Sequence, residues 1–380
     1  MASPTLSRYS DSPLVRSAST YLRNFDYILL GTIIFMILFG ILMIASATRD
    51  VASLADRVNS QILFSFVGVA VVFIVAAVDY RLLTSTYLWI YGIIVLILGA
   101  VGILGTQGDA GAQSWLNLGV AGFQPSELAK ILLIIVLAKQ LSNNADKMDK
   151  LTTILGSLTF VAVPVFFIFI QPDLGITILV LVTWFVMVWA AGLRWRHIAL
   201  FAIVGLVVMP ILWGQMEDYQ RSRITVFIDP SSDPDAFFNI NQALTAIGNG
   251  GLLGRGYMQG SQVQLRYLRV RHTDFIFAVI AEELGFVGAL AVLILMAIVI
   301  LRILRAARLS HDMAGALICY GVATVIFFQT LVSVGMNIRV LPVTGLTLPF
   351  ISSGGSSLVT LMMGVGMVQS VLLRQDPRQW

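Results

Sequence analysis

A series of long apolar runs constrains this chain more than any other feature of its sequence. Hydropathy indicates ten such runs, with boundaries defined to within a few residues. They lie near residues 27–47, 60–78, 83–105, 127–141, 151–170, 174–191, 197–213, 274–301, 314–335 and 350–373. A helix of about 20 apolar residues is long enough to cross the hydrocarbon of a bilayer. The sequence therefore predicts an all-α polytopic membrane protein with ten transmembrane helices.

Composition agrees with this class and excludes others. Of the 380 residues, 58% are hydrophobic and 12% are charged, which excludes an ordinary soluble domain. The net charge of +4 does not indicate nucleic acid as a partner, because the basic residues lie in loops between the apolar runs. The single cysteine, Cys319, lies inside an apolar run, so we expect neither a disulfide framework nor a cysteine metal site within the chain.

The chain divides into a short tail and one membrane domain. Residues 1–24 are polar, Ser-rich and basic, and we interpret them as a cytoplasmic tail. Residues 25–380 are expected to form a single transmembrane domain. The first apolar run ends in Ala45-Ser46-Ala47, which resembles a signal-peptide cleavage site, but the run is long enough to span and further spans follow. We therefore interpret it as an uncleaved anchor.

The distribution of Lys and Arg predicts the orientation. Basic residues concentrate in the segments that share a side with the N-terminus, which indicates that both termini are cytoplasmic. The long loop 214–272, between the seventh and eighth spans, is then extracytoplasmic. Within it, apolar residues recur at helical spacing and predict an amphipathic helix on the outer membrane surface. These residues are Phe237, Ile240, Leu244 and Ile247.

Asp274 lies where the eighth span begins, and Glu282 and Glu283 follow in the same apolar run. A carboxylate is costly in hydrocarbon, so an acid kept there usually faces a cavity, a partner or a substrate. Alternatively, Thr273 and Asp274 cap the helix by accepting hydrogen bonds from its free N–H groups. Residue type alone does not decide between the two.

Glu127 and Lys130 are three residues apart at the outer end of the fourth span, so they share a helix face. One interpretation is a first-turn acid that complements the helix dipole and pairs with the lysine. The other is an ion pair lining an outward cavity, with Lys130 available to an anionic group. Their position in an apolar helix favours the second. Trp115, in the loop before this span, is either an interfacial aromatic residue or part of the same site.

The long external loop contains further candidates for anion binding. Arg221 and Arg223 would point to the same side of an extended strand, and arginine matches the geometry of phosphate oxygens. The glycines around Arg255 could offer backbone N–H groups to an anion, although such loops are more often simply flexible. We interpret Asp233-Pro234-Asp235 as a turn. Only His272 among the histidines is external, so no His-ligated metal cluster is expected.

Residues 342–359, PVTGLTLPFISSGGSSLV, precede the final helix with two prolines and several Gly and Ser pairs. This pattern indicates irregular backbone that dips toward the membrane before a helix N-terminus, a geometry that binds polar or anionic groups; the alternative is a plain turn. An acid, an acid–base pair and external arginines would suit either transfer of a lipid-linked sugar or a polyprenyl-lipid flippase. The residues alone do not choose.

Several motifs occur in a characteristic order along the chain: QPSELAK, QPDLG, RITVFIDP, NQALTAIGNGGLLGRG, HTDFIFAVIAEELGFVG and PVTGLTLPFISSGGSS. Through them the chain resembles the SEDS family (shape, elongation, division and sporulation) over nearly its whole length. The short tail and Asp79-Tyr80-Arg81 look more like the RodA branch than the FtsW branch.

The resemblance implies a peptidoglycan glycosyltransferase that polymerises lipid II at the outer face of the bacterial cytoplasmic membrane during cell elongation and shape maintenance. A class B penicillin-binding protein would be its partner, with membrane lipids around it. The alternatives are a lipid II flippase and a division-type, FtsW-like member of the same family.

The resemblance also assigns site residues. It places the essential acid of the family on Asp274, which would act as general base in an inverting displacement, and its Glu and Lys on Glu127 and Lys130. Further substrate-binding candidates are Trp115, Gln124, Ser126, Arg221, Arg223, Gln242, Arg255, His272, Ser352, Ser353, Gly354 and Gly355. No resident metal is expected, and a divalent cation, Mg or Mn, would be held by the pyrophosphate itself.

The chain departs from the family pattern at a few positions. Ser114 replaces an arginine before the tryptophan, Leu268-Arg269-Val270 replaces Leu-Pro-Glu, Asp235-Ala236-Phe237-Phe238 replaces a glycine-rich stretch, and Arg339 replaces a glycine. None of these changes removes a motif acid, so the expected activity stands. They do put the substrate contacts near Ser114 and Arg339 in doubt.

Overall fold

The computed structural model describes residues 24–49, 54, 56–107, 113–117, 122–265 and 267–375. The predicted cytoplasmic tail lies outside these residues, except for Asn24. Long helices make up most of the described chain. They are α2 (Tyr27–Thr48), α3 (Asp56–Ala77), α5 (Tyr87–Leu104), α6 (Pro125–Ser142), α7 (Leu151–Ile170), α8 (Leu174–Ala190), α9 (Trp195–Gln215), α13 (Ile276–Arg308), α14 (Met313–Asn337) and α15 (Gly355–Leu373).

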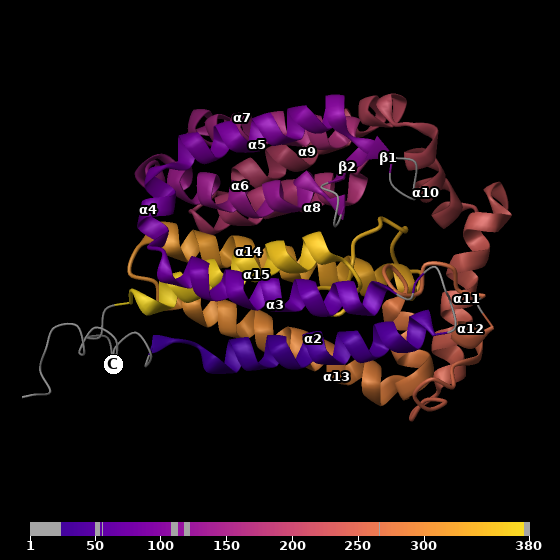
Figure 1. The fold of residues 1–380 in the computed structure, drawn as a ribbon. Coiled ribbons are helices and arrows are strands. Elements are labelled where there is room, and N and C mark those ends of the chain that lie inside the picture. The colour runs from indigo at the N-terminus through magenta and orange to yellow at the C-terminus, as the bar shows by residue number, and fades with distance from the viewer. Residues whose placement is uncertain are drawn as a thin grey trace, which may run out of the picture.

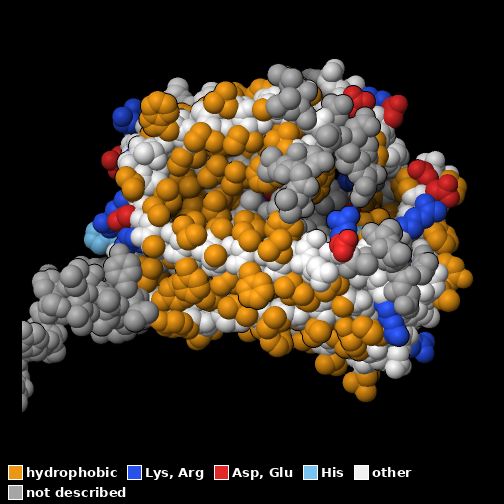
Figure 2. Space-filling view, in the orientation of Figure 1, with side chains coloured by type: hydrophobic (Ala, Val, Ile, Leu, Met, Phe, Trp, Pro, Cys, Tyr) orange, Lys and Arg blue, Asp and Glu red, His pale blue; other side chains and the backbone are white. Residues whose placement is uncertain are grey.

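Each predicted apolar run coincides with one of these helices. Among the described residues, six helices are long and apolar enough to cross a membrane, namely α2, α3, α7, α13, α14 and α15. Figure 2 shows charged side chains gathered at two ends of one face, with hydrophobic side chains between them. The chain is therefore a multi-pass membrane protein, and the total of ten spans stays a prediction.

Shorter elements connect the long helices. They are α4 (Tyr80–Ser85), η2 (Ala145–Lys147), α10 (Asp218–Ile228), η3 (Pro230–Ser232), α11 (Pro234–Gly250) and α12 (Ser261–Gln264). In Figure 1 the long helices run side by side, and α10, α11 and α12 lie across the end of the bundle opposite α4. The predicted amphipathic helix is α11, and it begins where a turn was expected, because Asp233 caps it by accepting a hydrogen bond from the amide of Ala236.

The predicted all-α architecture is confirmed apart from one short connection, between α5 and α6, that contains strands. Strands β1 (Thr106–Gln107), β2 (Gln113–Asn117) and β3 (Gly122–Phe123) form an antiparallel sheet in that order. This connection is rich in glycine and lacks the apolar periodicity of a helix. Strand pairing instead satisfies its backbone groups at the edge of the bundle.

Three predicted boundaries also change. The third span is broken at Thr86, between α4 and α5, and the last helix begins at Gly355 rather than 350. Helix α13 extends beyond the predicted end at 301 and is broken at Gly285, where φ is 70°. A Cβ at Gly285 would lie 2.3 Å from the backbone nitrogen of Gly254, so the close approach of the 251–256 loop requires glycine.

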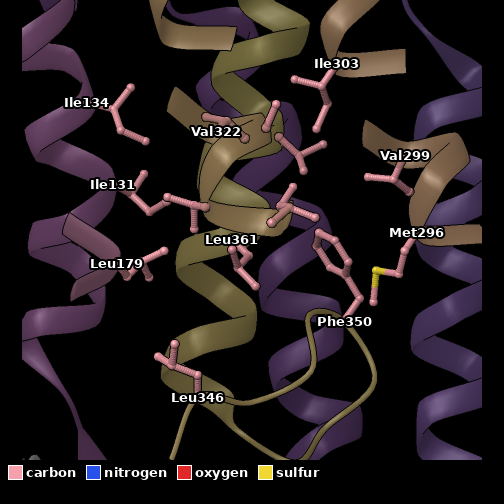
Figure 3. Close-up of a cluster of buried hydrophobic side chains, with 14 of the residues drawn as sticks. Ile131, Ile134, Leu179, Met296, Val299, Ile303, Val322, Leu346, Phe350 and Leu361 are labelled. Atoms are coloured by element: carbon pink, nitrogen blue, oxygen red, sulfur yellow. The ribbon is translucent and has the colours of Figure 1, made fainter. Parts of the chain in front are cut away.

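The buried core lies between α6, α8, α13, α14 and α15. Figure 3 shows side chains from these helices, Ile131, Ile134, Leu179, Met296, Val299, Ile303, Val322 and Leu361. Two further core residues, Leu346 and Phe350, come from the irregular segment 342–354 that precedes α15. Because these two side chains are buried with the helices, the segment is held firmly despite its lack of regular structure.

Candidate active site

Asp274 lies in the turn before α13, and it does not cap that helix. The N-cap position is Phe275, which makes no side-chain capping bond. The amide of Ala278 is instead bonded to the side-chain oxygen of Asn337 on α14, at 3.0 Å. The capping interpretation of Asp274 is therefore wrong, and its carboxylate is left for another role.

The carboxylate of Asp274 and the guanidinium of Arg223 border the same point of the backbone. A Cβ added at Gly345 would lie 3.4 Å from a guanidinium nitrogen of Arg223 and 4.0 Å from Oδ2 of Asp274. Burial raises the pKa of Asp274, while the charge of Arg223 and a hydrogen bond from Thr273 act in the opposite direction. The site thus places the Asp274 carboxyl, whose pKa is raised, near the Arg223 guanidinium.

Arg223 reaches this position because its segment is helical. An α-helix places residues two apart on different sides, so the prediction that Arg221 and Arg223 point the same way is wrong. Arg221 turns back and donates to the carbonyls of Trp213 at 3.1 Å and Gly214 at 3.0 Å. Arg223 packs 4.5 Å from the ring centre of Tyr219 and faces Asp274.

The predicted ion pair between Glu127 and Lys130 is confirmed. Lys130 donates to the Glu127 carboxylate, and the two side chains are only 1% and 8% exposed, respectively. Thr360 on α15 lies 3.5 Å from the same carboxylate oxygen. An anion could reach the Lys130 ammonium only if these neighbours moved.

Asp173, in the turn between α7 and α8, is an acid of this site that the sequence reasoning missed. It caps α8 through the amide of Ile176 and accepts a hydrogen bond from Gln124, both at 3.0 Å. The pKa of Asp173 is raised to about 6, mainly by burial; Glu127 also raises it, while the Ile176 amide, Arg223 and Lys130 lower it. An acid between two apolar runs was the available signal, the same one that pointed to Asp274.

These interactions connect the charged groups into one cluster. Arg223 interacts electrostatically with both Asp173 and Asp274. Asp173 also interacts electrostatically with Glu127 and Lys130. We call these five residues the charged cluster. It combines side chains from α6, the α7–α8 turn, α10 and the segment before α13, which lie far apart in the sequence.

The other sequence candidates divide into two groups. Gln124 contacts Asp173, Ser126 is fully buried on α6, and the Trp115 ring packs closely over Gly122. Arg255 and Gln242 make no hydrogen bond or ion pair with the charged cluster among the described residues. The amides of Arg255 and Gly256 donate instead to the carbonyls of Glu282 and Glu283, each at 2.9 Å.

The backbone carbonyls of Glu282 and Glu283 hold the glycine-rich loop, while their carboxylates bind α12 and α2. The Glu282 carboxylate accepts hydrogen bonds from the hydroxyl of Ser261 at 3.1 Å and the amide of Gln262 at 2.9 Å. The Glu283 carboxylate accepts from Ser46 on α2. Both acids therefore bind parts of their own chain.

The C-terminal candidates lie against the Asp274 segment. Ser352 donates to the carbonyl of Thr273 at 2.8 Å, and the amide of Ser353 donates to the carbonyl of His272 at 3.0 Å. The prediction of irregular backbone before the final helix is confirmed, since that helix starts only at Gly355.

A cavity of about 550 Å³ opens between α3, β3 and α15. Its apolar wall includes Leu63, Phe64 and Val67, and its polar residues include Asn59 and Thr360. Figure 2 shows the hollow on this face of the molecule. Thr360, in the wall of this cavity, also contacts Glu127, so one residue separates the cavity from the buried ion pair.

The chain is similar to known proteins along nearly its whole length. The family of cell cycle proteins FtsW, RodA and SpoVE matches residues 26–376. The peptidoglycan glycosyltransferase MrdB of Escherichia coli (strain K12) is 36% identical over 350 residues, covering 92% of this chain and 93% of the relative.

Two solved structures share the fold. A chain from a peptidoglycan synthase complex, described as coordinating polymerization and crosslinking, matches with a TM-score of 0.80 and 31% identity, covering 93% of this chain and 99% of that chain. The rod shape determining protein RodA of Thermus thermophilus matches with a TM-score of 0.70 and 29% identity, covering 93% and 98%. Both matches extend over most of the described helices.

Proposed function

This chain belongs to the SEDS family of cell cycle proteins, with FtsW, RodA and SpoVE, and we propose that it polymerises lipid II into glycan strands during cell elongation. The chain is a peptidoglycan glycosyltransferase of the shape-determining kind. The observation that carries the proposed chemistry is the charged cluster, in which Asp274 and Arg223 both border Gly345, and Glu127 contacts Thr360 in the wall of the cavity.

Asp274 is the general base. The acceptor's 4-hydroxyl attacks the anomeric carbon of the donor sugar, forming the new C–O bond as the bond to the pyrophosphate oxygen breaks. The hydroxyl proton passes to Asp274, and the pyrophosphate leaves with the bonding electron pair. A buried carboxylate with a raised pKa is a stronger base than an exposed one, so burial favours this transfer.

Arg223 stabilises the leaving group. Negative charge grows on the pyrophosphate as its bond to the sugar breaks, and a guanidinium can donate two parallel hydrogen bonds to phosphate oxygens. Glu127 orients Lys130, which is a second cation for this charge once its neighbours move. Arg221 is the weaker candidate, because backbone carbonyls already accept its hydrogen bonds.

The residues do not fit a metal held by the protein. Across the part of the chain that the structure describes, no three His, Cys, Asp or Glu side chains are grouped so that they could hold an ion. A divalent cation would therefore be held by the pyrophosphate of the substrate, and the steps above use only side chains of this chain.

The cavity between α3 and α15 suits a lipid-linked sugar better than a water-soluble one. Leu63, Phe64 and Val67 can contact an apolar chain, while the end at Thr360 is polar and adjoins the Glu127–Lys130 pair. A lipid with a charged headgroup matches this arrangement, with its apolar chain against the apolar wall and its headgroup at the polar end.

The membrane arrangement and the partner follow the same reasoning. We propose ten spans with both termini cytoplasmic, which places the loop 214–272 and the charged cluster at the outer face. The partner is a class B penicillin-binding protein, supported by the similarity to a chain of a peptidoglycan synthase complex.

Reconstitution in lipid vesicles separates the transferase from the flippase. Purified protein and its class B partner would be supplied with lipid II, and both glycan chains and lipid II translocation would be measured. Formation of glycan chains without translocation of lipid II across the membrane supports the proposal. Translocation without chains, from folded protein with its partner present, would overturn it.

A further inference from the structure

The backbone around Asp274 is fixed by hydrogen bonds to three successive carbonyls. Each carbonyl accepts a hydrogen bond from a different residue. The carbonyl of His272 accepts from the Ser353 amide at 3.0 Å. That of Thr273 accepts from the Ser352 hydroxyl at 2.8 Å, and that of Asp274 accepts from the Asn337 amide group at 2.9 Å. The groups come from α14 and from the irregular segment before α15.

Asn337 uses its whole carboxamide for this purpose. Besides the Asp274 carbonyl, its Nδ2 donates to the carbonyl of Ser333 at 2.7 Å, and its Oδ1 accepts from the Ala278 amide at 3.0 Å. The side chain is fully buried. Aspartate would keep the acceptor and lose both donors, and leucine would lose all three bonds, so asparagine chemistry is required here.

The hydroxyl of Ser352 makes two hydrogen bonds, one that it accepts and one that it donates. Its hydroxyl accepts from the Leu348 amide at 2.9 Å while it donates to the Thr273 carbonyl. Gln61, from α3, brackets the same turn: it donates to the Ser352 carbonyl at 3.4 Å and accepts from the Gly354 amide at 3.3 Å. The core side chains of Leu346 and Phe350 anchor the segment from the inside (Figure 3).

We infer that Asn337, Ser352 and Gln61 are positioning residues that fix the Asp274 carboxylate relative to Arg223. The bonds from Asn337 and Ser352 to this segment all go to backbone groups next to Asp274, and Gln61 acts through Ser352. The inference rests on the proposed role of Asp274 as general base. It gives Ser352 a different role from the substrate contact that the sequence predicts, because the hydroxyl proton of Ser352 is already donated to the Thr273 carbonyl.

Small displacements matter for such a base. A general base must come within hydrogen-bonding reach of the proton that it removes, and misplacement by about 1 Å can cost on the order of 100-fold in rate. Loosening these contacts should therefore lower kcat and leave the binding of lipid II unchanged.

The test uses Asn337→Asp, Ser352→Ala and Gln61→Glu, with Ser352→Thr as the conservative variant that keeps the hydroxyl. The purified complex with the class B partner would be assayed for kcat and KM with lipid II and for thermal unfolding. We expect Asn337→Asp and Ser352→Ala to lower kcat roughly 10- to 100-fold with KM within about twofold. Gln61→Glu should lower it less, and Ser352→Thr should restore most of the rate.

Thr330→Ala is the matched control. Thr330 is a buried polar residue of α14 that bonds only the carbonyl of Ile326, at 2.7 Å, so its loss affects the helix without reaching Asp274. Its kcat per folded molecule should match that of the wild type.

The outcomes separate this inference from the proposed function. A wild-type kcat in folded Ser352→Ala overturns the positioning role, as does a raised KM at constant kcat, which would indicate a substrate contact. If Asn337→Asp fails to fold, the comparison of Ser352→Ala with Ser352→Thr still tests the positioning role. Activity in an Asp274→Ala protein assayed in parallel would instead overturn the role of Asp274 itself.

Discussion

Lys130 donates a hydrogen bond to Glu127 inside the helix bundle, where the two side chains are 1% and 8% exposed. Breaking a buried pair leaves one uncompensated charge, which typically destabilises a protein by about 3–5 kcal/mol. We therefore expect Glu127→Gln and Lys130→Met to be strongly destabilised, and the double variant to regain most of the stability. Thermal unfolding in detergent would measure this.

Activity should not return with stability in the double variant, because the proposed role of Lys130 requires its charge. Simple additivity of the two single losses would contradict the description of these residues as one coupled pair.

Arg223 should set the acid limit of activity. Asp274 accepts a proton only when ionised, so activity falls as pH drops through its pKa. Burial raises this pKa and Arg223 lowers it, so Arg223→Met should move the acid midpoint of kcat to higher pH and reduce kcat. Arg221→Met is the matched control, since Arg221 bonds backbone carbonyls, and it should leave the midpoint in place. Equal shifts in both variants would contradict the assignment.

Filling the cavity should hinder lipid II. Val67 lines the cavity, whereas its neighbour Phe66 is 74% exposed and does not line it. We expect Val67→Trp to raise KM for lipid II several-fold with little change in thermal stability. Phe66→Trp should behave as the wild type. An identical KM in both variants would argue against the cavity as the route of the substrate.

The break in α13 should be intolerant of a side chain. At Gly285 the backbone has φ 70°, and a Cβ would approach the Gly254 nitrogen to 2.3 Å. We expect Gly285→Ala to destabilise the protein by more than about 2 kcal/mol. Gly31→Ala, in α2, has no atom within 4 Å of the new Cβ and should be neutral or stabilising by up to about 1 kcal/mol. Unfolding temperatures of the two variants would decide.

Local features of this chain could be predicted from its sequence. Apolar length located the long helices, because spanning a bilayer is a requirement on consecutive residues. The spacing of Glu127 and Lys130 gave their ion pair, since residues three apart share a helix face. An acid at the start of an apolar run identified Asp274, although only the structure excludes its role as a helix cap.

Features that depend on distant contacts could not be predicted. The polar α10 segment lacks a clear periodicity, so the choice between strand and helix, and with it the direction of Arg221, was not determined by local sequence. Asn337 caps α13 from another helix, and Gln61 reaches the segment before α15 from α3. No local pattern encodes such pairings, because they arise when the helices pack.

The most direct test of the central claim is polymerisation of purified lipid II by this protein and its class B partner, comparing wild type with Asp274→Asn. The substitution keeps the size of the side chain but removes its negative charge and its ability to accept a proton. We predict long glycan chains from the wild type and none from the variant, with equal unfolding temperature and equal lipid II binding. Glycan chains from Asp274→Asn at a rate near that of the wild type would contradict the account.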